Sequence, residues 1–149
     1  MKQHGLSSTD HGELIGRRWI VVADDDENAA NMLAGYLLHQ RFRAYPTRRG
    51  VEALRVAEAY PLALAVIDVQ LADMAGRDLV ARLRAIDPGL PVIMTTADFG
   101  PAVETDARQL GIVQYVQKPF DFRRLELVAA RIFAIRLNLA GAGSLRSDP

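Results

Sequence analysis

Four apolar runs of the chain each end in polar residues that could do chemistry. The runs lie at 19–23 (WIVVA), 62–67 (LALAVI), 91–94 (PVIM) and 112–116 (IVQYV). The polar residues that follow them are Asp24, Asp25 and Asp26, then Asp68, then Thr95 and Thr96, and finally Lys118 with Pro119. Taken singly, each has a structural explanation, because Asp caps helices, Thr suits strands and Lys is usually solvated. Together they indicate a site if the fold brings the ends of the runs to one crevice.

Three carboxylates gathered in one crevice would repel one another unless a cation neutralised them. Oxygen ligands, without Cys or His, favour Mg²⁺. Lys118 would then be available for an anion, and phosphate is the obvious candidate. The composition agrees, because the chain has no Cys and its three His residues have unrelated spacings, which argues against a zinc site.

The segments between the runs have helical spacing, and this alternation predicts a doubly wound α/β fold. Short continuous apolar runs are typical of parallel strands that are buried on both faces. We predict strands near 18–24, 43–47, 62–68, 91–96 and 112–117. We predict helices near 27–40, 50–60, 76–86, 101–110 and 121–139, with Asp121 as the cap of the last.

The order of the strands follows from the weakest one, at 43–47, which contains Pro46. Proline cannot donate to a sheet ladder, so this strand belongs at an edge. An edge position for the second strand agrees with the flavodoxin-like order 2-1-3-4-5, a five-stranded parallel (βα)5 sheet. Ligands of such sheets bind beyond the carboxyl ends of the strands, where the strand order reverses. That point lies between the first and third strands, which lead into Asp24 and Asp68.

The pattern of these residues resembles that of the receiver domain of two-component response regulators, the CheY-like phosphoacceptors. The resemblance covers about four-fifths of the chain, from Trp19 to Ile135. The matching positions are Asp24-Asp25, Asp68 followed by Leu71, Met74 and Gly76, then Thr96-Ala97 and Lys118-Pro119-Phe120. The joint pattern is specific, although no single piece of it is.

The resemblance implies a role for each site residue. Asp68 is implied to be the phosphoacceptor, with Asp25 binding Mg²⁺ directly and Asp24 binding it directly or through water. The backbone carbonyl of Gln70 completes the implied metal ligands. Thr96 is implied to hydrogen-bond a phosphoryl oxygen, Lys118 to pair with the phosphoryl group, and Tyr115 to be the aromatic switch.

An acyl phosphate on Asp68 would add roughly two negative charges and new acceptor oxygens. Drawing Thr96 toward them would leave a space that Tyr115 could enter, which would bias the surface formed by residues 101–110, 112–117 and 121–139. Mixed charges on that surface, such as Arg123, Arg124 and Glu126, would allow a homodimer across a two-fold axis.

The chain divides into a polar leader at 1–16, a receiver domain at 17–135 and a helical extension with a tail at 136–149. Residues 141–144 (GAGS) are expected to end the last helix. The chain is expected to be cytoplasmic, with a sensor histidine kinase or phosphotransfer protein as its partner and no membrane segment. Lys plus Arg and Asp plus Glu both number 18, which argues against direct nucleic-acid binding.

Two other functions remain open. A haloacid-dehalogenase-like phosphatase would use an Asp-x-Asp motif after the first strand, a spacing that Asp24 and Asp26 supply, but it leaves Asp68 without a role. A degenerate receiver would bind partners without phosphate. On the preferred interpretation the chain is not an enzyme beyond catalysing its own phosphorylation and dephosphorylation.

Overall fold

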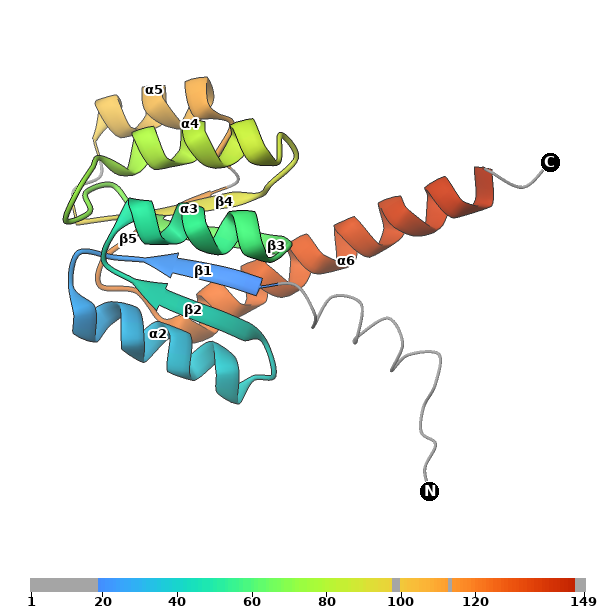
Figure 1. Ribbon diagram of the computed structural model, residues 1–149, viewed down its shortest axis with the longest axis horizontal. Helices are drawn as coiled ribbons and strands as arrows, with labels where there is room; N and C mark the ends of the chain where they lie inside the picture. Colours follow the sequence, from blue (N-terminus) through green and yellow to red (C-terminus); the bar gives the residue numbers. More distant parts are fainter. Residues whose placement is uncertain (1–18, 98–99, 113, 147–149) are drawn as a thin grey trace.

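A five-stranded parallel sheet forms the centre of the molecule in a computed structural model, which describes residues 19–97, 100–112 and 114–146 (Figure 1). The strand order is β2-β1-β3-β4-β5, as predicted. The strands are β1 (Trp19–Ala23), β2 (Arg43–Thr47), β3 (Leu62–Asp68), β4 (Val92–Thr96) and β5 (Gln114–Gln117). β2 lies at an edge, where Pro46 pairs in register with Val22 and its missing N–H faces no further strand.

Helices connect the strands and cover both faces of the sheet. They are α2 (Glu27–His39), α3 (Gly50–Ala59), α4 (Gly76–Ile86), α5 (Pro101–Leu110) and α6 (Phe122–Arg146). Two of them begin at the Asp caps that the sequence indicates. Asp26 accepts hydrogen bonds from the amides of Asn28 and Ala29, and Asp121 accepts one from the amide of Arg123.

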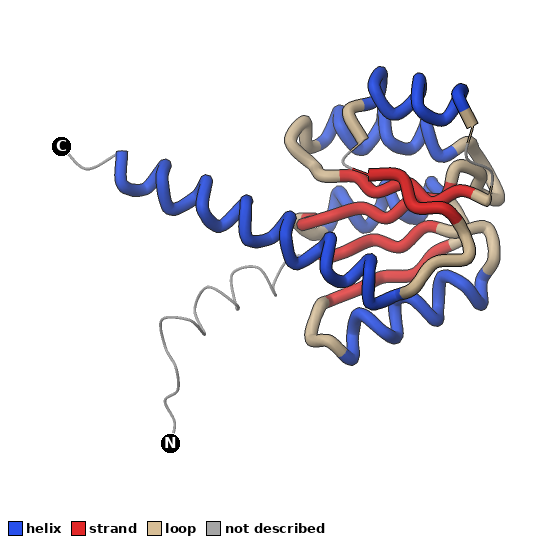
Figure 2. Tube along the Cα trace, turned by 180° about the vertical axis from the view of Figure 1, so that it is seen from behind, coloured by secondary structure: helices blue, strands red, loops and turns tan. Residues whose placement is uncertain are grey.

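Alternating residues of each strand point into two separate apolar cores. Ile20 and Val22 of β1 pack with the buried faces of α2 and α6, whereas Val21 and Ala23 pack with α3 and α4. Figure 2 shows α6 crossing the same face of the sheet that α2 covers. β3 is buried along its whole length, which explains why its sequence is continuously apolar from Leu62 to Ile67 rather than alternating.

The last helix differs from the prediction at its end. We predicted a helix near 121–139 that residues 141–144 would end, but α6 continues to Arg146 and extends beyond the body of the domain (Figures 1 and 2). Glycine costs only about 1 kcal/mol relative to alanine inside a helix and keeps its backbone N–H, so Gly141 and Gly143 do not break the hydrogen-bond ladder as proline would. The fifth strand is also shorter than predicted, because β5 begins at Gln114 rather than at residue 112.

The other boundaries lie within two residues of the predicted ones. The predicted leader at 1–16 lies outside the described residues. Within the described part of the chain, no helix combines the length and apolarity needed to cross a membrane.

Candidate functional site

Two carboxylates and one ammonium group meet where β1, β3 and β5 end. The Lys118 Nζ donates to Asp24 Oδ2 at 2.8 Å and to Asp68 Oδ2 at 2.6 Å. Asp24 and Asp68 are 8% and 9% exposed, so both charges are largely removed from water. The parallel sheet places the three residues together, because the carboxyl ends of its strands all lie at one edge.

Backbone hydrogen bonds fix the positions of two of these three residues. The Asp24 amide donates to the carbonyl of Thr47 at 2.9 Å, which ties the end of β1 to the end of β2. The Lys118 amide donates to the carbonyl of Thr96 at 2.7 Å, and the Lys118–Pro119 peptide bond is cis. The site is therefore held by the frame of the sheet rather than by a free loop.

The second oxygen of each carboxylate accepts a hydrogen bond from a backbone amide. Asp24 Oδ1 accepts from the Asp26 amide at 2.9 Å, and Asp68 Oδ1 accepts from the Gln70 amide at 3.4 Å. The Gln70 side chain turns away to donate to the carbonyl of Leu71 at 3.2 Å. Asp68 Oδ1 thus has one long contact among the described residues. It is more available to a ligand than Asp68 Oδ2, which Lys118 binds.

The electrostatics of the site favour an additional cation. Burial raises the pKa of the Asp68 carboxyl, and the charge of Asp24 adds to the increase, although the hydrogen bond from Lys118 opposes it. Burial by itself would lower the pKa of Lys118, but the hydrogen bonds to Asp24 and Asp68 outweigh it, and the pKa is raised. The single Lys118 charge therefore leaves the two carboxylates incompletely compensated.

Asp25 does not join the other two carboxylates. It is exposed and pairs with Arg48, whose Nη2 lies 3.5 Å from Asp25 Oδ1 and whose Nε donates to the Asp25 carbonyl at 2.8 Å. Among the described residues, no group of three or more His, Asp or Glu side chains is arranged to hold a metal. Of the three carboxylates expected to converge, Asp24 and Asp68 thus share Lys118, whereas Asp25 pairs with Arg48.

The donor chemistry of the site nevertheless fits a hard divalent cation. Two buried carboxylates share one ammonium group, a third lies on the adjacent residue, and the available ligands are all oxygen atoms. The remaining predicted residues lie on the strands beside them. Thr96 is 2% exposed at the end of β4. Tyr115 is half-buried on β5, where it pairs in register with Met94 of β4.

Comparison with known proteins decides the family. The model of the family described as "Response regulator receiver domain" matches residues 20–130. The chain belongs to this family. A similar curated protein is the regulatory protein VanRc of Enterococcus gallinarum, 34% identical over 74% of this chain and 46% of its own length. The probable transcriptional regulatory protein TcrX of Mycobacterium tuberculosis is 31% identical over 72% of this chain and 46% of its own length.

Solved structures show the same fold. The CheY-like receiver domain protein of Methanospirillum hungatei has a TM-score of 0.70 at 24% identity, covering 77% of this chain and 93% of that one. The chemotaxis protein CheY4 of Vibrio cholerae has a TM-score of 0.72 at 21% identity, covering 77% and 98%. The chain spans about half, or less, of the length of the curated relatives that it matches, so their full activities do not transfer to it directly.

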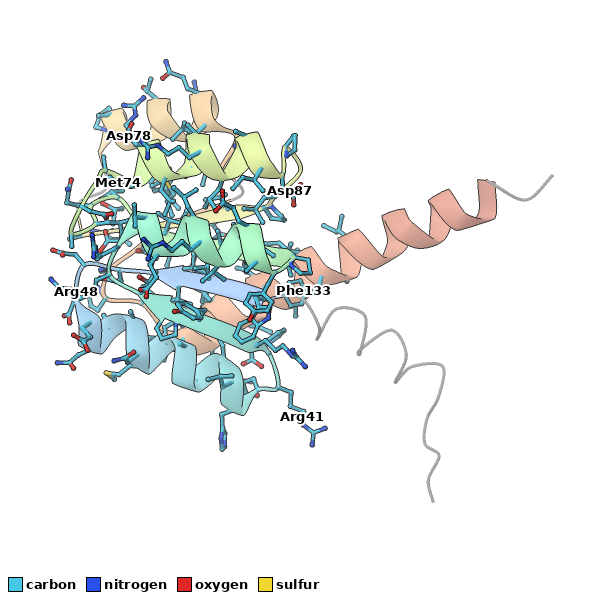
Figure 3. All side chains as sticks on the ribbon, viewed as in Figure 1. Arg41, Arg48, Met74, Asp78, Asp87 and Phe133 are labelled. Atoms are coloured by element: carbon cyan, nitrogen blue, oxygen red, sulfur yellow. The ribbon has the colours of Figure 1, made fainter. Side chains whose placement is uncertain are left out.

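The receiver domain also contains a network of loop contacts that sequence reasoning missed. Asp73, in the loop after β3, accepts hydrogen bonds from the amides of Gly50 and Val51 at 2.7 and 3.1 Å and so caps α3. The Ala72 amide donates to the carbonyl of Arg48 at 3.0 Å. Figure 3 shows Arg48 and Met74 at the same end of the domain, opposite Phe133. No spacing rule could reveal these contacts, because they join loops more than 20 residues apart.

Gly76 completes the local framework beneath Asp68. Its amide donates to the carbonyl of Val69 at 2.8 Å, and an added Cβ would lie 2.2 Å from the backbone oxygen of Asp68. Any side chain here would displace the Asp68 backbone, so glycine is required for the close approach of α4 to the end of β3.

Proposed function

We propose that this receiver domain accepts a phosphoryl group on Asp68 from the phosphohistidine of a sensor histidine kinase or phosphotransfer protein. The observation that carries the proposal is the Asp68 carboxylate at the end of β3, with Oδ2 held by Lys118 at 2.6 Å and Oδ1 weakly engaged. In the transfer, an Asp68 oxygen forms a bond to phosphorus and the bond from phosphorus to the donor nitrogen breaks.

Each neighbouring residue has a role in this transfer. Lys118 neutralises charge on the phosphoryl oxygens, and the Thr96 hydroxyl donates a hydrogen bond to one of them. Asp24, Asp25, Asp68 and the carbonyl of Gln70 would hold Mg²⁺, as the oxygen donor set permits. Mg²⁺ would supply charge neutralisation at the transferred group. The reaction is confined to the chain's own phosphorylation and dephosphorylation.

The full chain labelled with acetyl phosphate and Mg²⁺, then reduced with borohydride, identifies the acceptor by mass spectrometry. We expect label on Asp68 alone and none in Asp68→Asn. Asp73→Asn, which alters a carboxylate five residues away that caps α3, is the matched control and should label normally. Label on Asp24 would instead support the phosphatase alternative, and a chain that takes no label would be a phosphate-independent receiver.

Metal binding is tested separately from phosphorylation. We expect Mg²⁺ to produce saturable NMR shifts at the amides of Asp24, Asp25 and Asp68, and we expect saturation to be lost in Asp25→Ala. Saturation that survives this substitution would place the metal elsewhere.

The output of the switch is proposed to lie on the surface of α5, β5 and α6. Thr96 and Tyr115 lie on β4 and β5, next to this surface, and Arg123 and Arg124 are exposed at the start of α6. Phosphorylation would change self-association or partner binding there. Sedimentation velocity with and without beryllofluoride should detect a dimer that Arg123→Glu/Arg124→Glu weakens. A monomer in both states at every concentration would remove self-association as the output.

A further inference from the structure

A cavity of about 480 Å³ lies beside the acid site, between α2 and the start of α6. Val22 and Val66 of the sheet form its floor, and Leu33 of α2 and Phe122 of α6 form part of its walls. This volume lies within the range of about 300–1,000 Å³ that is usual for small-molecule sites, and mainly apolar walls are typical of them. Asp24 and Lys118 of the acid site are among its lining residues, and the proposed phosphoryl transfer makes no use of its apolar part.

The cavity results from a small residue on the inner stripe of α2. Asp26, Ala29 and Leu33 follow one another at spacings of three and four residues, so they share one face of the helix, and all three line the cavity. Ala29 contributes only a methyl group at the middle of this stripe. A leucine there would carry three more carbon atoms into the space between α2 and Phe122.

The charged groups at the rim of the cavity have a net negative charge. Asp24, Asp26 and Lys118 line the cavity, and Asp68 forms an ion pair with Lys118. Three carboxylates thus stand against one ammonium group, which Asp24 and Asp68 already bind. Oδ1 of Asp26 caps α2, while no contact to its Oδ2 occurs among the described residues. The N-terminus of α2 contributes about half a positive charge, too little to reverse this balance.

We propose that this cavity binds a small organic cation, with its apolar body between α2 and Phe122 and its ammonium group against Asp26 and Asp24. An anion of the same shape would meet the carboxylates and gain little from Lys118, whose Nζ is already engaged. A neutral molecule would bury the same apolar surface without the electrostatic gain. This proposal stands whether or not Asp68 accepts phosphate.

Three probes of similar shape and different charge test the proposal on the isotope-labelled full chain: 2-phenylethylamine, 2-phenylethanol and 3-phenylpropionate. Ligands of this size bind with dissociation constants on the order of 1 mM, so NMR titration is the suitable measurement. We expect saturable shifts around the cavity, with the amine binding most tightly and the acid most weakly. Intermolecular NOEs from the ring protons to the methyl groups of Leu33 and Val66 should locate the aromatic body.

Three variants separate the contribution of the cavity from that of the rim charge. Ala29→Leu should abolish saturation by filling the space, whereas Ala85→Leu, at an exposed position of α4, should leave binding unchanged. Asp26→Asn keeps a good helix cap but removes the rim charge. This substitution should weaken the binding of the amine by about two- to fivefold, the usual effect of one exposed ion pair. The affinity for the alcohol should not change.

Several outcomes would overturn the proposal. They are an absence of saturable shifts with all three probes, an absence of NOEs to Leu33 and Val66, undiminished binding in Ala29→Leu, or tightest binding of the acid. An amine affinity that is unaffected by Asp26→Asn would also contradict the assigned position of the ammonium group. The NOE measurement uses the unaltered chain, so the proposal stays testable even if Ala29→Leu fails to fold.

Discussion

The two ends of the central sheet are built from opposite chemistry. At the carboxyl ends of the strands, two buried carboxylates share the ammonium group of Lys118. At the amino ends, Trp19 packs against Tyr45 and Tyr60 with ring centroids 6.4 and 5.5 Å apart, and Arg43 lies 5.9 Å from the Trp19 ring. The same strands therefore position charges for chemistry at one end and aromatic contacts for stability at the other.

The difference between the ends is a difference in electrostatic cost. Aromatic burial stabilises the fold without any charge to compensate. Buried carboxylates lose hydration, and the raised pKa of Asp68 records that loss. The carboxyl end is thus the part of the domain where removing one partner should leave the other groups unfavourably buried.

The largest effect is expected for Lys118→Met. It leaves Asp24 and Asp68 buried without a cation and should lower the free energy of unfolding at pH 7 by about 2–3 kcal/mol. Pairing with Asp24 and Asp68 raises the pKa of Lys118, so the Lys118 charge contributes fully at pH 7. On the alkaline side this contribution is lost only as the pH rises above 10.5 and through the folded pKa. Urea unfolding at several pH values measures the change.

Asp68→Asn is the matched control for this effect. In Lys118→Met the deficit should shrink as the pH falls and Asp68 protonates, since its pKa is raised in the folded state. The double variant Lys118→Met/Asp68→Asn should recover part of the loss at pH 7. A Lys118→Met chain as stable as the wild type would contradict the contrast between the two ends.

The second effect concerns the aromatic end. Trp19 is only partly buried, so Trp19→Ala should cost about 1.5–2 kcal/mol, below the range for a fully buried tryptophan. Because Trp19 lies at the opposite end of β1 from Asp24, Mg²⁺ affinity measured by NMR should not change. Tyr60→Ala, at a residue 51% exposed, should cost less. A loss of metal binding in Trp19→Ala would show that the two ends are not separable.

A third effect concerns the Mg²⁺ affinity at the carboxyl ends of the strands. The Arg48 guanidinium contacts both the side chain and the backbone carbonyl of Asp25. Arg48→Gln should release the Asp25 carboxylate. We expect Mg²⁺ to bind about three- to fivefold more tightly, with stability changed by less than about 0.5 kcal/mol, because the ion pair is exposed. Isothermal titration calorimetry measures the affinity.

Arg49→Gln removes the same charge from the next residue, for which no contact with Asp25 is found among the described residues. It should change the affinity less than Arg48→Gln does. Equal effects of the two substitutions would mean that general charge, rather than the Asp25 contact, controls the metal affinity.

The smallest effect is expected for Asp73→Asn. Burial would raise the pKa of Asp73, but the amides of Gly50 and Val51 outweigh it, and the pKa is lowered. Its stabilising contribution is therefore present above pH 3.8 and is lost as the pH falls through the folded pKa. Asparagine keeps one acceptor, so the loss at pH 7 should be about 0.5 kcal/mol by thermal unfolding. An unchanged pH dependence below pH 5 would contradict this assignment.

The sequence by itself determined the fold and most of the site. Continuous apolar runs and helical spacing predicted the alternation of strands and helices, and Pro46 placed β2 at the edge. Strand ends of one parallel sheet share an edge, so Asp24, Asp68 and Lys118 had to meet once the strand order was known. The cap residues Asp26 and Asp121 could be recognised because capping depends on adjacent residues only.

Only the tertiary structure decided the contacts between loops and the space between helices. Asp25 follows Asp24 directly, yet its exposed carboxylate pairs with Arg48 from another loop. The cavity beside Ala29 depends on how α2 and α6 pack, and the capping of α3 by Asp73 depends on two loops that the sheet brings together. Such features arise from residues far apart in the chain, for which no local pattern of residue types carries a signal.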